Sequence, residues 1–362
     1  MPTCIYCREE LGTEHFNKEH VVPLQFGAFE NNQTLVHTVC RHCNTYFGRS
    51  LENALGRNSF EAIFRLRHGQ KLHRDFVGFA DGRLSFRIPS SQRGTGMIVT
   101  PEPDPEVGDI VLKIPPQVGI QREGQSEFRY YTEEELRTDG PTLLPTGSKP
   151  TLRLITAKDD DSGFERLRDL VRTLVPKFQE QGEVNLAPPE RFNGQIIVEV
   201  GGTIDKLIAR AVAKIAFNYM AKHAGVGFAL NSCFDPIRWF IRNDEGGDDW
   251  RQFVQVVTKP LLAQETDDLR VTQGHIVLLG WPTIYALQAY VSPYNSIAYQ
   301  VTMTTSFAGL WRPIKVGHVF DWEHRVIHKL MAIGAIMLPP GWAQRPAKAY
   351  AAIVERPPDG HQ

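Results

Sequence analysis

The sequence lacks a long apolar run, and it lacks an excess of either charge. No stretch reaches about 18 consecutive apolar residues, so we expect no membrane-spanning helix. The 362 residues include 40 Lys and Arg and 41 Asp and Glu, which gives a net charge of −1. The chain as a whole is therefore not polybasic, and any contact with nucleic acid must come from a local cluster of basic side chains.

Cysteine is also scarce, with five in the whole chain. Four of them form two Cys-x-x-Cys pairs, Cys4 with Cys7 and Cys40 with Cys43. This spacing is typical of a metal site and not of a secreted disulfide scaffold. The first residues, MPTCIYCREE, lack the apolar run of a signal peptide. We therefore expect a cytoplasmic protein in a reducing compartment.

The two cysteine pairs suit a single Zn²⁺ ion bound by four thiolates. Each pair contributes two ligands from one turn, and the intervening loop closes over the metal. Because four thiolates fill a tetrahedral coordination sphere, this zinc should be structural and not catalytic.

A second group of polar residues lies within and beside this loop. Glu19 and His20 lie between the two pairs, and Asn44 follows directly on Cys43. Carboxylate and amide oxygens are hard ligands that suit Mg²⁺ or Mn²⁺. A neighbouring histidine can take a proton from water. These are the parts that phosphodiester hydrolysis requires, namely a divalent ion that neutralises charge and a base that activates water.

These motifs resemble those of the HNH endonucleases, the ββα-metal class, in the subgroup that two Cys-x-x-Cys pairs brace. The resemblance rests on EHVVP at Glu19–Pro23 and on CRHCN at Cys40–Asn44, and it covers about residues 1–70. The acidic residue is Glu19, where the family more often has the shorter Asp. The resemblance implies an N-terminal zinc-braced ββα module with DNA as its substrate.

The resemblance also implies roles for single residues. His20 would be the general base, and Glu19 and Asn44 would bind the catalytic Mg²⁺ or Mn²⁺. An asparagine before the second cysteine pair would order the loop, and Asn32 is the best candidate for it, with Asn31 and Gln33 as alternatives. The zinc ligands would be Cys4, Cys7, Cys40 and Cys43.

The pattern of apolar residues predicts an α+β fold in three regions. The first is an HNH nuclease domain over 1–74, with a knuckle and four elements expected at 1–8, 19–26, 34–39, 44–56 and 60–69. The second, over 75–150, is a β-rich connecting or recognition region, with a turn at Asp81-Gly82 and a strand at 110–114. The third, over 151–362, is an α+β domain for target recognition, dimerisation or regulation. Its strands are expected at 151–157 and 194–200 and within 275–304, and its helices at 164–178, 204–219 and 320–333.

One helix of the third region carries a basic stripe. Lys206, Arg210 and Lys214 are spaced by four residues on the helix that Thr203 is expected to cap. We expect this stripe to be a solvated face, and a surface that follows a DNA backbone is the alternative.

The sequence therefore predicts a metal-dependent DNA endonuclease of a restriction or phage-defence type. Its specificity would come from residues 75–362, through DNA contacts, a homodimer, or a modified base or small molecule bound by the C-terminal region. Two alternatives stay open. One is a non-catalytic zinc-containing protein that binds nucleic acid, and the other is an HNH effector nuclease that a ligand activates.

Overall fold

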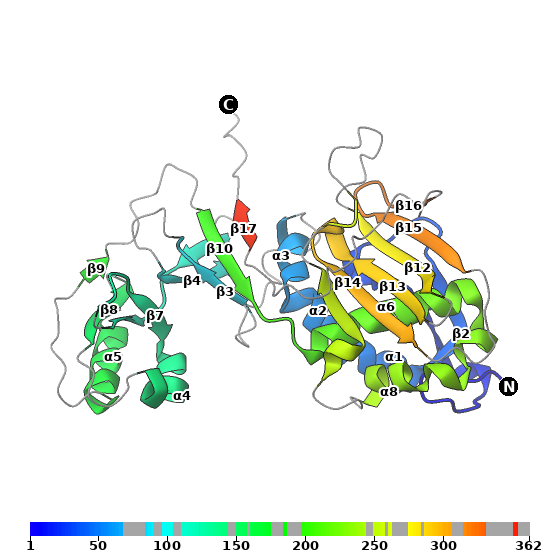
Figure 1. Ribbon diagram of the computed structural model, residues 1–362, viewed down its shortest axis with the longest axis horizontal. Helices are drawn as coiled ribbons and strands as arrows, with labels where there is room; N and C mark the ends of the chain where they lie inside the picture. Colours follow the sequence, from blue (N-terminus) through cyan, green and yellow to red (C-terminus); the bar gives the residue numbers. More distant parts are fainter. Residues whose placement is uncertain are drawn as a thin grey trace. The chain divides into compact units, whose positions relative to one another are not determined.

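The contacts in the computed structural model group the chain into two compact units. One unit joins Met1–Leu72 with Ile204–Lys348, and the other joins His73–Thr203 with Ala349–Gln362 (Figure 1). The three functional domains expected from the sequence stay predictions. The structure describes residues 1–67, 84–89, 96–103, 110–122, 124–143, 150–157, 160–174, 184–186, 197–243, 249–257, 260–262, 274–283, 286–305, 314–330 and 350–353.

The N-terminal segment has the expected order of knuckle, strand, strand and helix. β1 (Phe16–His20) pairs antiparallel with β2 (Thr34–Cys40), and α1 (Arg41–Phe47) follows directly. The first strand begins at Phe16, earlier than expected, and ends at His20. It does not continue through Pro23, because proline lacks the backbone amide that donates hydrogen bonds within a β-sheet. The helical part continues through a π-helical turn at Gly48–Glu52, α2 (Asn53–Arg57) and α3 (Phe60–Arg67).

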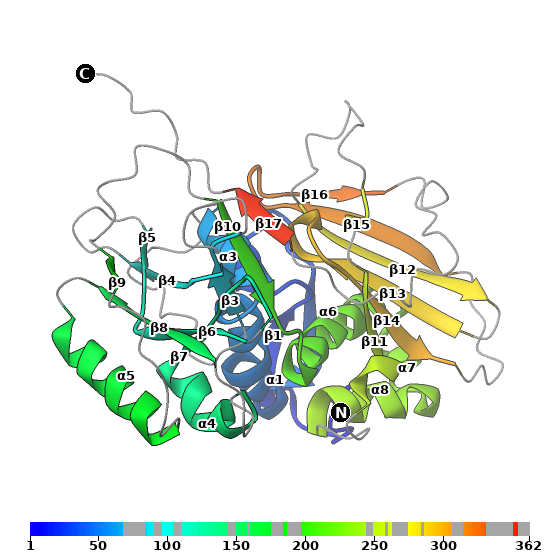
Figure 2. The same cartoon turned by 60° about the vertical axis from the view of Figure 1, so that its left-hand side comes forward.

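The central helix of this unit is α6 (Lys206–Ala224), which is buried along most of its length. On one side it contacts β2 and α2 of the N-terminal segment, and on the other it contacts β12, β13 and β14 of a sheet (Figures 1 and 2). A helix covered on both sides needs apolar residues around most of its circumference, and Ala, Ile, Val and Phe supply them here. One continuous core therefore joins the N-terminal segment to residues far along the chain.

The sheet against α6 has six antiparallel strands in the order β11-β14-β13-β12-β15-β16. Two short helices, α7 (Val226–Ala229) and α8 (Asp235–Asn243), follow α6 in the chain. The strands expected within residues 275–304 are confirmed. The bounds of the six strands are β11 Val254–Val257, β12 His275–Thr283, β13 Ala286–Ser292, β14 Ala298–Thr304, β15 Lys315–Asp321 and β16 Val326–Lys329.

The helix predicted over residues 320–333 is wrong. β15 and β16 pair there as a hairpin, and residues 331–333 lie outside the described part of the chain. The side chain of Asp321 accepts hydrogen bonds from the amides of Glu323 and His324, at 3.1 and 3.0 Å, and this closes the turn. Arg325 then takes a left-handed backbone conformation with φ of 59°. This turn chemistry overrides the helical spacing of the apolar residues.

Among its described residues, the second unit contains two sheets and two helices. Its five-stranded sheet has the order β17-β10-β3-β4-β5, and its four-stranded sheet has the order β7-β6-β8-β9. The helices α4 (Glu133–Leu143) and α5 (Asp161–Leu174) belong to this unit. The strands expected at 110–114 and 151–157 are confirmed, and the strand expected at 194–200 is confirmed over 197–200. Residues 194–196 and the expected Asp81-Gly82 turn lie outside the described residues. The strand bounds are β3 Leu84–Arg87, β4 Ile98–Pro103, β5 Ile110–Lys113, β6 Gln117–Gln121, β7 Arg129–Thr132, β8 Thr151–Ala157, β9 Val184–Leu186, β10 Ile197–Gly202 and β17 Tyr350–Ile353.

In the part of the chain that the structure describes, no helix is both long and apolar enough to cross a bilayer.

Candidate metal centre and nuclease site

The four paired cysteines converge on one point. Their sulfur atoms all lie within 4.8 Å of one another, and the sulfurs of Cys7 and Cys40 are 3.8 Å apart. A tetrahedral Zn²⁺ with Zn–S bonds of about 2.3 Å requires sulfur–sulfur distances of about 3.8 Å. The cluster is therefore compatible with a single zinc ion, as the sequence predicts.

Hydrogen-bond donors surround the cysteines, but the pKa shifts of the thiols differ. Burial raises the pKa of Cys7 to about 12, and the hydrogen bond with Cys4 raises the pKa of Cys43. The amides of Cys40 and Cys43 donate to the sulfurs of Cys4 and Cys40, at 3.3 and 3.5 Å, and Arg242 Nε of α8 donates to Cys43 at 3.2 Å. A hydrogen bond with Cys43, opposed by burial and helped by backbone amides, lowers the pKa of Cys4 to about 5. Such donors fix the ligands and stabilise their charge, and Arg242 is one that the sequence did not reveal.

Glu19 and His20 form the end of β1, where the pairing with β2 shifts register between Asn17 and Glu19. A bulge of this kind changes the direction of the side chains that follow it. Glu19 is buried, with 3% of its surface exposed, whereas His20 is half-buried. The two residues predicted to act together therefore sit side by side in very different environments.

Two side chains of α6 hold the carboxylate of Glu19. Asn218 Nδ2 donates to Glu19 Oε1 at 2.8 Å, and the ammonium of Lys214 forms an ion pair with the same oxygen. Lys214 is fully buried and also pairs with Glu52. Burial alone would lower the pKa of Lys214, but the two carboxylates raise it, so the side chain is charged. Burial raises the pKa of Glu19, and the ammonium of Lys214 opposes that rise.

His20 has the environment of a neutral imidazole. Burial lowers its pKa, and the positive charges of Lys214 and Lys18 lower it further. Its backbone oxygen accepts from Asn218 Nδ2 at 3.3 Å. A neutral ring is the form that can accept a proton from water.

Asn44 lies on α1 beside β1. Its Nδ2 donates to the backbone oxygen of Lys18 at 3.4 Å, which places the amide next to the residue that precedes Glu19. Within the described ranges neither Asn44 Oδ1 nor Glu19 Oε2 accepts a hydrogen bond. These two oxygens are hard donors, so the residues present fit a divalent ion such as Mg²⁺ or Mn²⁺.

The three candidates for the loop-ordering position make different contacts. Asn32 Oδ1 accepts from the amide of Phe29 at 2.9 Å and so closes the turn before β2. Asn31 adopts a left-handed backbone conformation with φ of 56°. Gln33 Oε1 lies 3.0 Å from His223 Nε2 of α6. Of the three, the Asn32 side chain is the one that bonds the loop backbone at this turn.

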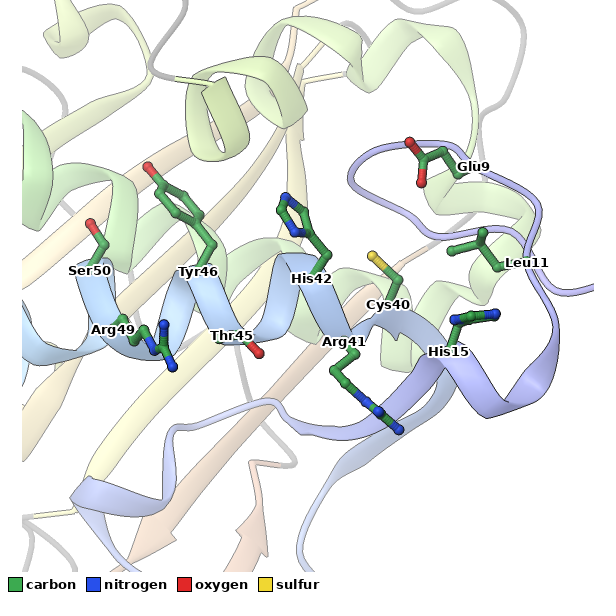
Figure 3. A pocket seen from close by; sticks show the side chains of 10 residues that line it. All are labelled: Glu9, Leu11, His15, Cys40, Arg41, His42, Thr45, Tyr46, Arg49 and Ser50. Atoms are coloured by element: carbon green, nitrogen blue, oxygen red, sulfur yellow. The ribbon is translucent and has the colours of Figure 1, made fainter.

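A surface hollow of about 750 Å³ runs along α1 and the cysteine knuckle (Figure 3). In the close-up, Glu9 and Leu11 on the knuckle face Cys40 and His42 on the helix side. The hollow excludes Glu19, His20 and Asn44, so it is not the candidate nuclease site. Its lining residues are Glu9, Leu11, His15, Cys40, Arg41, His42, Thr45, Tyr46, Arg49 and Ser50.

Residues 4–60 match the HNH_5 family model, which is described as HNH endonuclease. The resemblance predicted from the sequence is confirmed over this segment, which holds the knuckle, the hairpin and the first helices. The match supports nuclease activity at the level of the family and includes no residue of α6. No curated protein and no solved structure matches the chain.

The basic stripe on α6 is not the solvated face that the sequence predicted. Arg210 is 4% exposed and Lys214 is fully buried, because the N-terminal segment covers this side of the helix. The cap of α6 is also different, since Asp205 and not Thr203 accepts from the amide of Ile208. One sequence signal could have revealed the buried stripe. Arg210 and Lys214 interrupt a helix that is otherwise apolar on nearly every side.

Proposed function

We propose that this protein is a metal-dependent DNA endonuclease with His20 as general base. The proposal is supported by a segment that matches HNH endonucleases, in which His20 directly follows the buried carboxylate of Glu19 and the amide of Asn44 bonds to the backbone of Lys18. The zinc ligands stand apart from this group and brace it. We take the active compartment to be the cytoplasm.

In the proposed reaction, His20 accepts a proton from water as the oxygen of that water attacks phosphorus. Glu19 Oε2 and Asn44 Oδ1 would hold Mg²⁺ or Mn²⁺, which would stabilise the charge on the phosphate and on the leaving 3′ oxygen. Asn32 keeps the loop between the strands in place through its bond to Phe29. The phosphodiester P–O3′ bond breaks, and water supplies the new oxygen.

Cleavage of plasmid DNA by purified full-length protein tests the proposal. With Mg²⁺ or Mn²⁺ present, His20→Ala should lower the rate at least about a hundredfold, since a positioned base contributes that much. Zinc content and the circular dichroism spectrum should not change. His328→Ala, which removes an exposed histidine of β16, is the matched control. Equal cleavage by His20→Ala and the unaltered protein would rule out the mechanism.

The biological setting proposed here is restriction or phage defence. A small catalytic module makes few base contacts, so specificity must come from elsewhere in the chain, and residues 73–203 form a separate unit that can supply it. Cleavage of unmodified and base-modified DNA, compared side by side with the same preparations, would identify the target. Cleavage that is independent of sequence and modification would contradict this part of the proposal.

A further inference from the structure

One face of α6 is bonded along its length to the N-terminal segment. Arg210 Nη2 donates to the Tyr46 hydroxyl at 2.6 Å, and Lys222 Nζ donates to the backbone oxygen of Thr34 at 3.1 Å. Lys214 and Asn218 lie between them and reach Glu19. Residues four apart lie on one side of a helix, so these four form a single polar stripe. The two central members contact the residue predicted to bind the catalytic metal.

Packing alone does not account for Lys214. The side chain is fully buried, and a buried ammonium is costly unless carboxylates compensate its charge. Apolar side chains of similar volume in place of Lys214 and both of its carboxylate partners could fill this region at no greater cost. The ion pairs of Lys214 with Glu19 and Glu52 are therefore better explained by what they do to Glu19.

The hydrogen bond from Asn218 and the shortest contact from the Lys214 ammonium both fall on Glu19 Oε1. Among the described residues, Glu19 Oε2 accepts no hydrogen bond. The amide of Asn218 is itself oriented, because the hydroxyl of Tyr6 donates to its Oδ1 at 2.8 Å. Tyr6 lies between Cys4 and Cys7 in the zinc knuckle. A chain of hydrogen bonds thus runs from the knuckle through α6 to Glu19.

We propose that Lys214 and Asn218 are positioning residues of the nuclease site, which hold Glu19 by Oε1 and leave Oε2 for the divalent ion. The inference rests on the proposed function and extends the site to a helix outside the family match. Lys214 also sets the local charge. Its positive charge repels the divalent ion and so weakens the binding of that ion, and the negative charge of Glu52 offsets this repulsion.

This arrangement predicts opposite effects on metal binding for two neighbouring substitutions. Lys214→Met removes a positive charge next to Glu19 and should strengthen Mn²⁺ binding about tenfold, while cleavage at saturating Mn²⁺ slows because Glu19 is no longer held. Glu52→Gln leaves the ammonium less compensated and should weaken Mn²⁺ binding by a similar factor. Asn218→Leu keeps both charges, so it should slow cleavage with little change in Mn²⁺ affinity.

The experiment is calorimetry or electron paramagnetic resonance of Mn²⁺ binding to the zinc-loaded full-length variants, with cleavage kinetics on the same samples. Glu19→Gln, which should abolish tight Mn²⁺ binding, identifies the site. Parallel thermal melts show whether each variant is folded, and Glu52→Gln and Asn218→Leu test the idea even if Lys214→Met does not fold. Tyr6→Phe, which removes one hydroxyl, should reproduce part of the Asn218→Leu defect.

Two results would overturn the inference. One is an Mn²⁺ affinity that is the same in Lys214→Met, Glu52→Gln and the unaltered protein. The other is a loss of affinity and cleavage that merely follows the folded fraction. Failure of the proposed function looks different, since Mn²⁺ would then bind in a Glu19-dependent way without any cleavage of DNA.

Discussion

Buried charged side chains join distant parts of the first unit at the level of single residues. Lys214 pairs with Glu19 and Glu52, and Arg238 Nε donates to the backbone oxygen of Ile5 at 2.6 Å. Both basic side chains are fully buried. Removing one partner of such a pair leaves an uncompensated charge, which costs more than replacing both partners. These residues therefore make the geometry of the site sensitive to substitutions far away in the sequence.

Glu61 is a third buried charge-bearing residue, and it gives a prediction for stability against pH. The hydroxyl of Tyr299 donates to its Oε1 at 2.6 Å, and burial raises its pKa. The folded chain therefore binds this proton more tightly than the unfolded chain does. The resulting stabilisation of the folded state is present at low pH. It is lost as the pH rises from the pKa of glutamate in the unfolded chain through the higher pKa of Glu61 in the folded chain.

Glu61→Gln should remove this pH dependence, because the amide is neutral at every pH and keeps an acceptor for Tyr299. We expect Glu61→Gln to raise the melting temperature more at pH 8 than at pH 5, as measured by circular dichroism. Glu323→Gln, which replaces an exposed carboxylate of the same unit, is the control. Parallel melting curves for Glu61→Gln and the unaltered protein at both pH values would contradict the expectation.

The element that matters most for the site is the zinc knuckle. It contributes Cys4 and Cys7 to the cysteine cluster that is compatible with zinc, and it places Tyr6 against Asn218. Cys40 is the N-cap of α1, and its sulfur accepts from the amide of Cys43, so two residues of the cysteine cluster lie at the start of the helix. Loss of the metal should therefore loosen α1, and with it Asn44.

Cys7→Ser tests the role of the knuckle. The variant should lose its zinc, and its melting temperature should fall by at least about 5 °C, because metal binding to the folded state contributes folding free energy. Zinc content by atomic emission and thermal melts with and without a chelator measure both effects. Cys233→Ser, which alters the one cysteine outside the cluster, should keep the zinc and nearly the full stability. A Cys7→Ser protein that retained one zinc would exclude the four-cysteine site.

Across the whole molecule, the N-terminal module is not separate from the rest of its unit. Val21, Phe26, Phe47 and Leu55 are buried in one core with residues of α6 and of the six-stranded sheet. A fragment without these partners would expose that surface to water, which destabilises the fold. The segment that matches HNH endonucleases therefore relies on packing against α6 and the six-stranded sheet to keep its shape.

A fragment of residues 1–74 should accordingly be poorly folded and inactive, even with zinc present. Co-expression of residues 204–348 should restore a folded complex, which size-exclusion chromatography and nuclear magnetic resonance spectra can detect. This outcome would also distinguish the proposed enzyme from a nuclease whose C-terminal region does no more than repress its activity. A 1–74 fragment that cleaved DNA unaided would favour the ligand-activated alternative.

The local spacing of residues predicted the cysteine cluster and the order of the first elements. Two residues between paired cysteines place both sulfurs on one turn, so a cluster that is compatible with zinc follows from four positions in the sequence alone. The same holds for the hairpin and α1, whose residues alternate or repeat within a few positions. The adjacent pair of Glu19 and His20 could likewise be identified from the sequence without any knowledge of the tertiary structure.

Tertiary structure alone decided what surrounds Glu19. Asn218 lies 199 positions from Glu19, and the sequence predicted that its neighbour Lys214 would face solvent. Burial of a helix face depends on which segments pack against it, and no local pattern states that the N-terminal module covers α6. The helix predicted over 320–333 was wrong for a related reason, because the turn bonds of the hairpin there and its pairing with β12 outweighed the helical spacing of the apolar residues. The sequence alone thus determined which groups could bind metal and accept a proton, and packing at long range determined how the carboxylate among them is held.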